Sequence, residues 1–173
     1  FKIVLSRRLN PQVKLIRVEA PLIAKKAKPG QFVMLRIDEK GERIPLTIAD
    51  FADGTITLVF QEIGKTTMKL GSLKRGDFIM DIAGPLGTPS ELSGFKRVCV
   101  IGGGLGCAIA YPQAKALSQM GTEVDMIAGF RNKDLIFFED EMKAVSKRLI
   151  ITTDDGSNGN KGLVTDYLKK LIE

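Results

Sequence analysis

Residues 97–117 read RVCVIGGGLGCAIAYPQAKAL. This stretch divides the chain into two halves whose patterns of apolar and turn residues differ. The run Val98–Ile101 is apolar and rich in β-branched side chains, the composition of a strand buried on both faces. Glycines between positions 102 and 106 end that strand. Apolar residues then recur at helical spacing, and we expect the regular helix to begin near Pro112, since a proline costs little in the first turn of a helix. The stretch therefore predicts a strand, a glycine turn and a helix.

The glycine turn has the chemistry of a pyrophosphate cradle. Glycines let backbone N–H groups approach a phosphate closely, and the following helix adds the positive end of its dipole. Gly102 and Gly104 fit the first two glycines of the dinucleotide-binding fingerprint, but Cys107 stands at the third position. A tight strand-to-helix turn without a ligand remains the alternative. We expect Cys107 to be a small apolar filler rather than a reactive thiolate.

The chain has 173 residues, a length that suits one large or two small domains, and its composition limits the chemistry that it can perform. Without histidine and with two cysteines, no metal site or disulfide framework is predicted, and a cofactor is expected to carry any difficult chemistry. The net charge of +6 permits nucleic-acid binding, but the basic residues are scattered and tryptophan is absent, so solvated surface charge is preferred. No apolar run has the length of a membrane span, and a cytoplasmic location is expected.

The first half of the chain predicts an antiparallel barrel or sandwich. Turn residues such as Asp53-Gly54 separate short runs of alternating or β-branched side chains. The one helical candidate, residues 66–73, follows Gly64-Lys65, a second turn suited to phosphate; a capped surface helix is an equally good interpretation. The expected strands cover residues 2–5, 13–18, 32–37, 44–48, 55–60 and 78–82.

The second half alternates strands and helices, which predicts a parallel sheet with right-handed crossovers. Ligands of such sheets lie beyond the carboxyl ends of the strands. The glycine turn, residues 129–131 and residues 153–155 all fall there, so we expect these three segments to converge. The expected elements after the glycine turn are strands at 123–128 and 148–153 and helices near 138–146 and 164–172.

Six short motifs, in order, resemble the ferredoxin reductase superfamily, in which a flavin-binding β-barrel precedes a nicotinamide-binding α/β domain. Arg43-Ile-Pro-Leu-Thr47 is similar to its flavin signature. Thr153-Asp-Asp-Gly-Ser157, followed by Lys161-Gly162, resembles the electron-transfer subunits related to that of dihydroorotate dehydrogenase and the small FAD subunit of NADH-dependent ferredoxin:NADP oxidoreductase, also called sulfide dehydrogenase. The remaining motifs are Pro29-Gly-Gln-Phe32, Gly64-Lys-Thr-Thr67, Gly84-Pro-Leu-Gly87 and Gly102-Gly-Gly-Leu-Gly106.

The resemblance implies a FAD-binding, six-stranded antiparallel β-barrel at residues 1–94. It places the Thr47 hydroxyl near the flavin N5 edge, as the catalytic contact. The implied flavin-lining residues are Arg43, Pro45, Leu46 and Thr47, and the implied pyrophosphate-binding residues are Gly64, Lys65, Thr66 and Thr67.

For residues 95–173 the resemblance implies a parallel-sheet α/β domain that binds NAD(H) or NADP(H). Arg131 follows a strand end and favours a 2′-phosphate, hence NADP, whereas the resemblance favours NAD(H), which we prefer. The implied contacts are Gly102, Gly103, Gly104 and Gly106 for the nicotinamide nucleotide, and Arg131, Asp154, Asp155, Gly156 and Ser157 for its adenosine half.

The implied function is hydride transfer between NAD(P)H and FAD, with electrons passing through an iron–sulfur centre to a larger flavin or iron–sulfur partner subunit. Ferredoxin is a further candidate partner, and neither nucleic acid nor a membrane is expected. A non-catalytic, nucleotide-sensing or scaffold subunit of a redox complex is the alternative. Similar subunits continue with more strands and a four-cysteine segment for a 2Fe-2S cluster, so we expect this α/β domain to be truncated and the chain to be a fragment.

Overall fold

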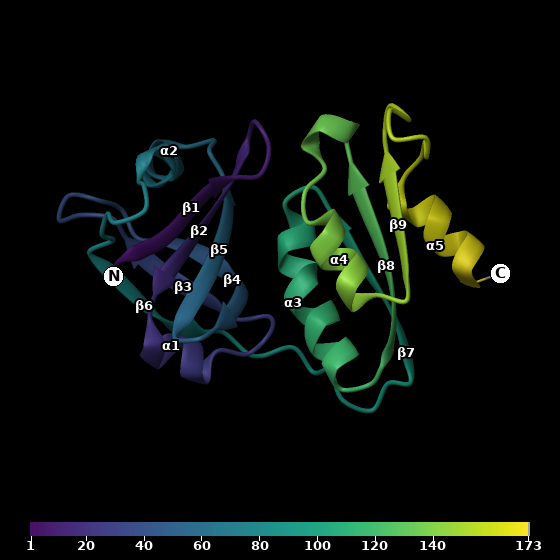
Figure 1. The fold of residues 1–173 in the computed structure, drawn as a ribbon, viewed down its shortest axis with the longest axis horizontal. Coiled ribbons are helices and arrows are strands. Elements are labelled where there is room, and N and C mark those ends of the chain that lie inside the picture. Colours follow the sequence, from purple (N-terminus) through teal and green to yellow (C-terminus); the bar gives the residue numbers. More distant parts are fainter. Residues whose placement is uncertain (173) are drawn as a thin grey trace. The chain divides into compact units, whose positions relative to one another are not determined.

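The computed structural model describes residues 1–172. The chain divides into two compact units, Phe1–Ser90 and Glu91–Glu173 (Figure 1). Each unit contains a single sheet, of six strands in the first and three in the second. This is the order of sheets that the two halves of the sequence predict.

Unit 1 is a six-stranded antiparallel barrel with the strand order β1-β2-β5-β4-β3-β6. The two edge strands, β1 and β6, close the barrel: the N–H of Ile3 in β1 donates to the carbonyl of Asp77, just before β6, at 2.8 Å. All six expected strands are present, although β6 begins later than predicted, since residue 78 makes only an isolated bridge to Lys2. The strands are β1 (Ile3–Arg8), β2 (Val13–Glu19), β3 (Phe32–Arg36), β4 (Ile44–Ala52), β5 (Thr55–Gln61) and β6 (Asp81–Leu86).

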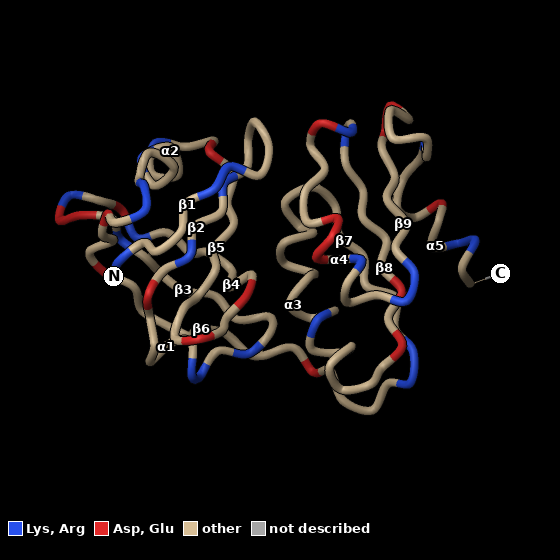
Figure 2. The backbone as a smooth tube through the Cα atoms, viewed as in Figure 1, with Lys and Arg blue, Asp and Glu red and all other residues tan. Residues whose placement is uncertain are grey.

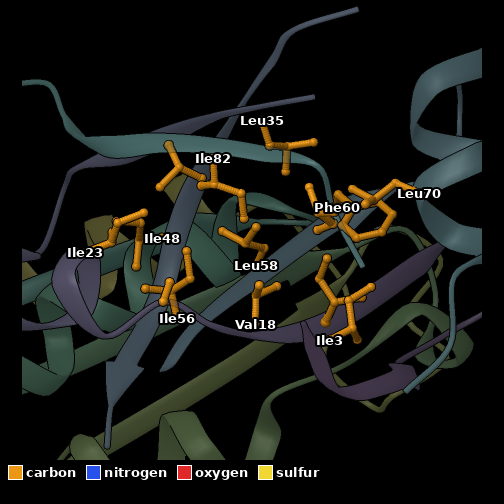
Figure 3. Packing of buried hydrophobic residues seen from close by; sticks show 14 of the residues in the cluster. Ile3, Val18, Ile23, Leu35, Ile48, Ile56, Leu58, Phe60, Leu70 and Ile82 are labelled. Atoms are coloured by element: carbon orange, nitrogen blue, oxygen red, sulfur yellow. The ribbon is translucent and has the colours of Figure 1, made fainter. Parts of the chain in front are cut away.

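The core of unit 1 fills the interior of this barrel (Figure 3). Ile56, Leu58 and Phe60 alternate along β5 and point into it, as the period of a strand requires. Two helices close the barrel, each with one buried hydrophobic side chain: α1 (Pro21–Lys26) contributes Ile23, and α2 (Lys65–Ser72) contributes Leu70. The sequence did not predict α1, because a six-residue helix with one buried side chain shows no helical period.

Unit 2 is a parallel sheet in the order β7-β8-β9 with helices on both faces (Figure 1). Gly102 of β7 pairs with Ala128 of β8 and faces α3, whereas the neighbouring Gly129 faces Val164 of α5, so α3 and α5 cover opposite faces. The elements are β7 (Arg97–Gly103), α3 (Gly106–Gln119), β8 (Glu123–Phe130), a 3-10 turn (Lys133–Leu135), α4 (Glu139–Val145), β9 (Arg148–Thr153) and α5 (Val164–Ile172).

The prediction that β7 is buried on both faces is wrong. Val98, Cys99 and Val100 are half-buried, and Ile101 is 37% exposed. The reason is the strand order, because β7 lies at an edge of the sheet while β8 lies in the centre and carries the continuous buried run.

The prediction that the helix begins near Pro112 is also wrong. Helix α3 begins at Gly106 and holds Pro112 in its interior. An interior proline loses one backbone hydrogen bond and costs about 3 kcal/mol. Burial of the helix face that contains Ala110, Ala114 and Leu117 offsets this cost, so tertiary packing overrides the local preference.

Within residues 1–172, no helix combines the length and the apolar composition needed to cross a bilayer. Lysine and arginine are interspersed with aspartate and glutamate along both units (Figure 2). This distribution agrees with the interpretation of the net charge as solvated surface charge.

Candidate functional site

The predicted flavin signature lies at the start of β4, beside β3. The register pairs Met34 with Pro45 and Phe32 with Thr47. Because side chains alternate along a strand, Pro45 and Thr47 share one face, and Leu46 lies on the other face against the barrel core. The contacts of all three with a flavin stay predictions.

Arg43, immediately before β4, is held by a carboxylate of β6. Its Nη2 lies 2.6 Å from Oδ2 of Asp81, and that oxygen is also 3.9 Å from Nη2 of Arg36. The Arg43 side chain is still 49% exposed. The salt bridge thus orients the guanidinium and leaves part of it accessible to an anion.

The second predicted phosphate turn forms the N-terminus of α2. The hydroxyl of Thr67 accepts hydrogen bonds from the N–H groups of Ile63 and Gly64, at 3.2 and 3.0 Å. The first hydrogen bond of the helix runs from the N–H of Met68 to the carbonyl of Gly64, at 2.8 Å. The N–H groups of residues 65–67 therefore have no acceptor within the helix, and they point towards the end that attracts anions.

A hydrogen bond brings the two parts of this site together. The Thr66 hydroxyl donates to Oε2 of Glu42 at 2.9 Å, and Glu42 is the neighbour of Arg43. We call Arg43, Pro45, Thr47 and residues 64–67 the β4–α2 site. It combines a cation, hydroxyls and helix N–H groups, a donor set that fits the pyrophosphate of FAD.

Sequence reasoning missed the carboxylates of this site. Asp38, Glu42 and Asp81 pair with Lys69, Thr66 and Arg43, respectively. The pairing with Lys69 holds the pKa of Asp38 below its usual range. No local signal marks these residues, because each partner lies more than twenty positions away in the chain.

In unit 2, the first glycine of the glycine turn is required for close packing. A Cβ on Gly102 would lie 2.8 Å from Cα and 3.0 Å from the backbone nitrogen of Cys107. Glycine at this position lets the end of β7 touch the start of α3. The following glycines differ, because a Cβ on Gly103, Gly104 or Gly106 would meet nothing within 4 Å. The turn is thus tight at its base and open at its tip, as a phosphate cradle requires.

Cys107 is fully buried beneath this turn. Burial raises the pKa of its thiol to about 12, so the thiol stays protonated at neutral pH. The prediction that Cys107 is an apolar filler is confirmed. The hypothesis of a reactive thiolate is wrong, because desolvation outweighs the helix dipole.

The three segments expected at the strand ends do meet. The N–H of Gly104 donates to the carbonyl of Gly129 at 2.8 Å, and the N–H of Asp154 donates to the carbonyl of Phe130 at 3.0 Å. The hydroxyl of Ser157 accepts the N–H of Lys133 at 2.8 Å. We call the glycine turn, Arg131 and residues 154–157 the strand-end site.

Three charged residues of the strand-end site are exposed: Arg131, Asp154 and Asp155. Arg131 is exposed, and its carbonyl accepts the N–H of Asp155 at 3.4 Å. The carboxylate of Asp155 accepts the N–H of Ser157 at 2.9 Å, and hydrogen bonds from Ser157 lower the pKa of Asp155. The backbones of residues 131 and 155 therefore meet where the adenosine half of a nucleotide is predicted to bind.

The residues present do not fit a 2Fe-2S cluster. Such a cluster takes four protein ligands, usually cysteines, and the chain has two cysteines. Over residues 1–172, no three histidine, cysteine or acidic side chains are grouped as metal ligands.

No family model matches the chain, but individual relatives do. The dihydroorotate dehydrogenase B (NAD(+)) electron transfer subunit homolog of Thermotoga maritima is 47% identical over 157 residues, which cover 90% of this chain and 55% of the relative. The dihydroorotate dehydrogenase B electron transfer subunit of Geobacillus thermodenitrificans is 32% identical over 97% of this chain and 68% of its own length. The chain thus spans roughly half to two thirds of these relatives.

The fold is shared with solved flavoenzymes. A chain in the structure of the NADH-dependent reduced ferredoxin-NADP oxidoreductase has a TM-score of 0.92 and 44% identity, over 99% of this chain and 63% of that one. A ferredoxin NADP+ reductase from Neisseria gonorrhoeae, solved with FAD and NADP, shares the fold at 19% identity and a TM-score of 0.77, over 98% of this chain and 74% of that one. As the six motifs predict, this chain belongs to the family of dihydroorotate dehydrogenase B electron transfer subunits and has the ferredoxin reductase fold.

Proposed function

We propose that the chain is the FAD- and nicotinamide-binding part of an electron-transfer subunit. It binds FAD at the β4–α2 site and a nicotinamide nucleotide at the strand-end site, and it passes electrons to a partner subunit. The observation that carries the proposal is the hydrogen bond between Thr66 and Glu42, which joins the flavin signature and the start of α2 into one site for an anionic cofactor.

Each part of the β4–α2 site has a task. Arg43 and the N–H groups of residues 65–67 bind the pyrophosphate, and Lys65 adds a cation at the helix start. Thr47, half-buried on the face that it shares with Pro45, presents its hydroxyl to the edge of the flavin ring. When bound, FAD supplies a hydride acceptor that releases electrons singly.

NAD(H) is the nucleotide that we propose for the strand-end site. Asp154 and Asp155 bring two exposed carboxylates to the same site as Arg131, and these negative charges disfavour the 2′-phosphate of NADP(H). The name of the Thermotoga maritima relative supports this choice, because it specifies NAD(+). Glycines 103, 104 and 106 leave room for the nucleotide phosphates.

The electrons are proposed to leave through an iron–sulfur centre to a larger partner subunit, with ferredoxin as a further candidate. The name of the relatives, electron transfer subunit, supports a partner. Residues 1–172 do not supply the ligands of that centre. The proposed location of the complex is the cytoplasm. A scaffold subunit that binds nucleotide without turnover is the competing proposal.

Replacing Arg43 with alanine should weaken FAD binding about tenfold, the effect of losing one charge-assisted contact with the pyrophosphate. Titration of the flavin-free chain with FAD, followed by flavin fluorescence, measures the dissociation constant. Arg75→Ala is the control, because it removes the same charge from an exposed turn outside the β4–α2 site. Equal FAD affinity in the wild type and Arg43→Ala would contradict the proposed site.

A further inference from the structure

The β4–α2 site already contains a negative charge. Glu42 is exposed, and its Oε2 accepts the Thr66 hydroxyl at 2.9 Å. Thr66 is the second residue of α2, so this carboxylate stands at the N-terminus of the helix. Glu42 belongs to the loop that precedes β4, which contains both acidic and basic residues (Figure 2).

A carboxylate in this position can interact with the N-terminus of α2 as a phosphate would. It balances the positive end of the helix dipole and accepts a hydrogen bond from the first turn. The pyrophosphate of FAD carries two negative charges. In the proposed site it binds the same Thr66 hydroxyl and the same positive end of the α2 dipole. Both anions cannot occupy the helix end without strong repulsion.

Asp81 is a different case, although it also pairs with an expected phosphate ligand. In its salt bridge with Asp81 the Arg43 side chain is still half exposed and uses only Nη2, so Arg43 can bind both anions at once. The Thr66 hydroxyl has one proton, which it donates to Glu42. Only Glu42 must therefore give up its hydrogen bond when a phosphate takes the hydroxyl.

We infer that Glu42 sets the affinity of the β4–α2 site for FAD, because its carboxylate holds an anion position that the pyrophosphate must take over. This inference rests on the proposed function. Glu42 lies on an exposed loop, so its side chain can swing away when the cofactor enters. Glu42 thus joins the loop before β4 to Thr66 and at the same time limits how tightly FAD is held.

The test is to measure FAD affinity in Glu42→Gln and Glu42→Ala. Removing one repulsive charge near the phosphates should tighten FAD binding roughly fivefold in both variants, as expected for charges that are partly screened by solvent. ADP, used as a competitor against FAD, should gain a similar factor, because it carries the same pyrophosphate. Riboflavin, which has no phosphate, should bind with unchanged affinity.

The matched control is Glu39→Gln. Glu39 lies three residues earlier in the same exposed loop, and it makes no hydrogen bond or ion pair within residues 1–172. This change alters the net charge equally, and FAD affinity should change by less than about twofold, because the exposed charge is screened. Equal tightening in Glu39→Gln and Glu42→Gln would show a general charge effect and overturn the inference.

If Glu42 only held the Thr66 side chain in place, the change in FAD affinity would have the opposite sign. In that case Glu42→Ala weakens FAD binding, and this result would overturn the inference. A wild type that binds FAD, with unchanged affinity in Glu42→Gln, contradicts the inference alone. A wild-type chain that binds no FAD contradicts the proposed function and the inference together.

Discussion

Replacing Gly102 with alanine should destabilise unit 2 by about 2 kcal/mol, the cost of forcing an extra methyl group into a packed site. The added Cβ would lie 2.8 Å from Cα of Cys107 and 3.0 Å from its nitrogen. Both are backbone atoms, so the strain cannot be relieved by rotating a side chain. Helix α3 would have to move away from β7, and the glycine turn would lose the geometry proposed to hold a nucleotide.

Tyrosine fluorescence can follow this effect in unit 2 alone. The chain has no tryptophan, and both of its tyrosines, Tyr111 and Tyr167, lie in unit 2. Gly103→Ala is the matched control, because its Cβ would meet nothing within 4 Å, and its cost should stay below about 0.5 kcal/mol. Urea unfolding of both variants, followed by tyrosine fluorescence, compares how far each substitution destabilises unit 2. Equal midpoints for Gly102→Ala and Gly103→Ala would show that the close approach is unimportant.

Replacing Asp125 with asparagine should destabilise unit 2 by about 2 kcal/mol at neutral pH, less than for a fully buried pair because both arginines are partly exposed. The Asp125 side chain is 6% exposed, in the centre of the sheet. Its Oδ2 lies 2.8 Å from Nη2 of Arg97 on β7 and 3.2 Å from Nη2 of Arg148 on β9. One carboxylate therefore ties all three strands together.

The effect of Asp125→Asn should depend on pH. Hydrogen bonds from Arg148 and then Arg97 lower the pKa of Asp125 in the folded chain. A lowered pKa stabilises the fold above the unfolded pKa of about 3.9, and this contribution is lost as the pH falls through the folded pKa. The difference in the free energy of unfolding between the wild type and Asp125→Asn should thus be largest at neutral pH and smaller in strong acid.

Glu123→Gln is the matched control for Asp125→Asn. Glu123 lies on the same strand and also pairs with Arg97, at 3.4 Å, but its side chain is solvent-accessible. Its loss should cost less than about 1 kcal/mol, as for surface ion pairs. Urea unfolding at neutral pH and near pH 3 measures both variants. A difference for Asp125→Asn that is the same at both pH values would contradict the role of its charge.

Local patterns predicted most of the fold. The bounds of β9 and α5 agree with the prediction, as do the Asp53-Gly54 hairpin and the glycine turn between β7 and α3. Strand alternation, helical spacing and turn glycines are properties of neighbouring residues, so they can be recognised without knowledge of the packing.

The errors concern features that depend on distant residues. The exposure of β7 follows from its place at the sheet edge, and the early start of α3 follows from the burial that offsets the cost of Pro112. The contact between Glu42 and Thr66 joins residues 24 positions apart. None of these features has a signature within the span of one strand or one helix.

The most direct test of the proposed function is the visible spectrum of the FAD-loaded chain during anaerobic addition of NADPH and then NADH. The predicted result is a flavin band at about 450 nm that NADH bleaches and that NADPH bleaches much less. A chain that takes up no FAD, or a bound flavin that neither nucleotide reduces, would contradict the proposal and favour the scaffold subunit.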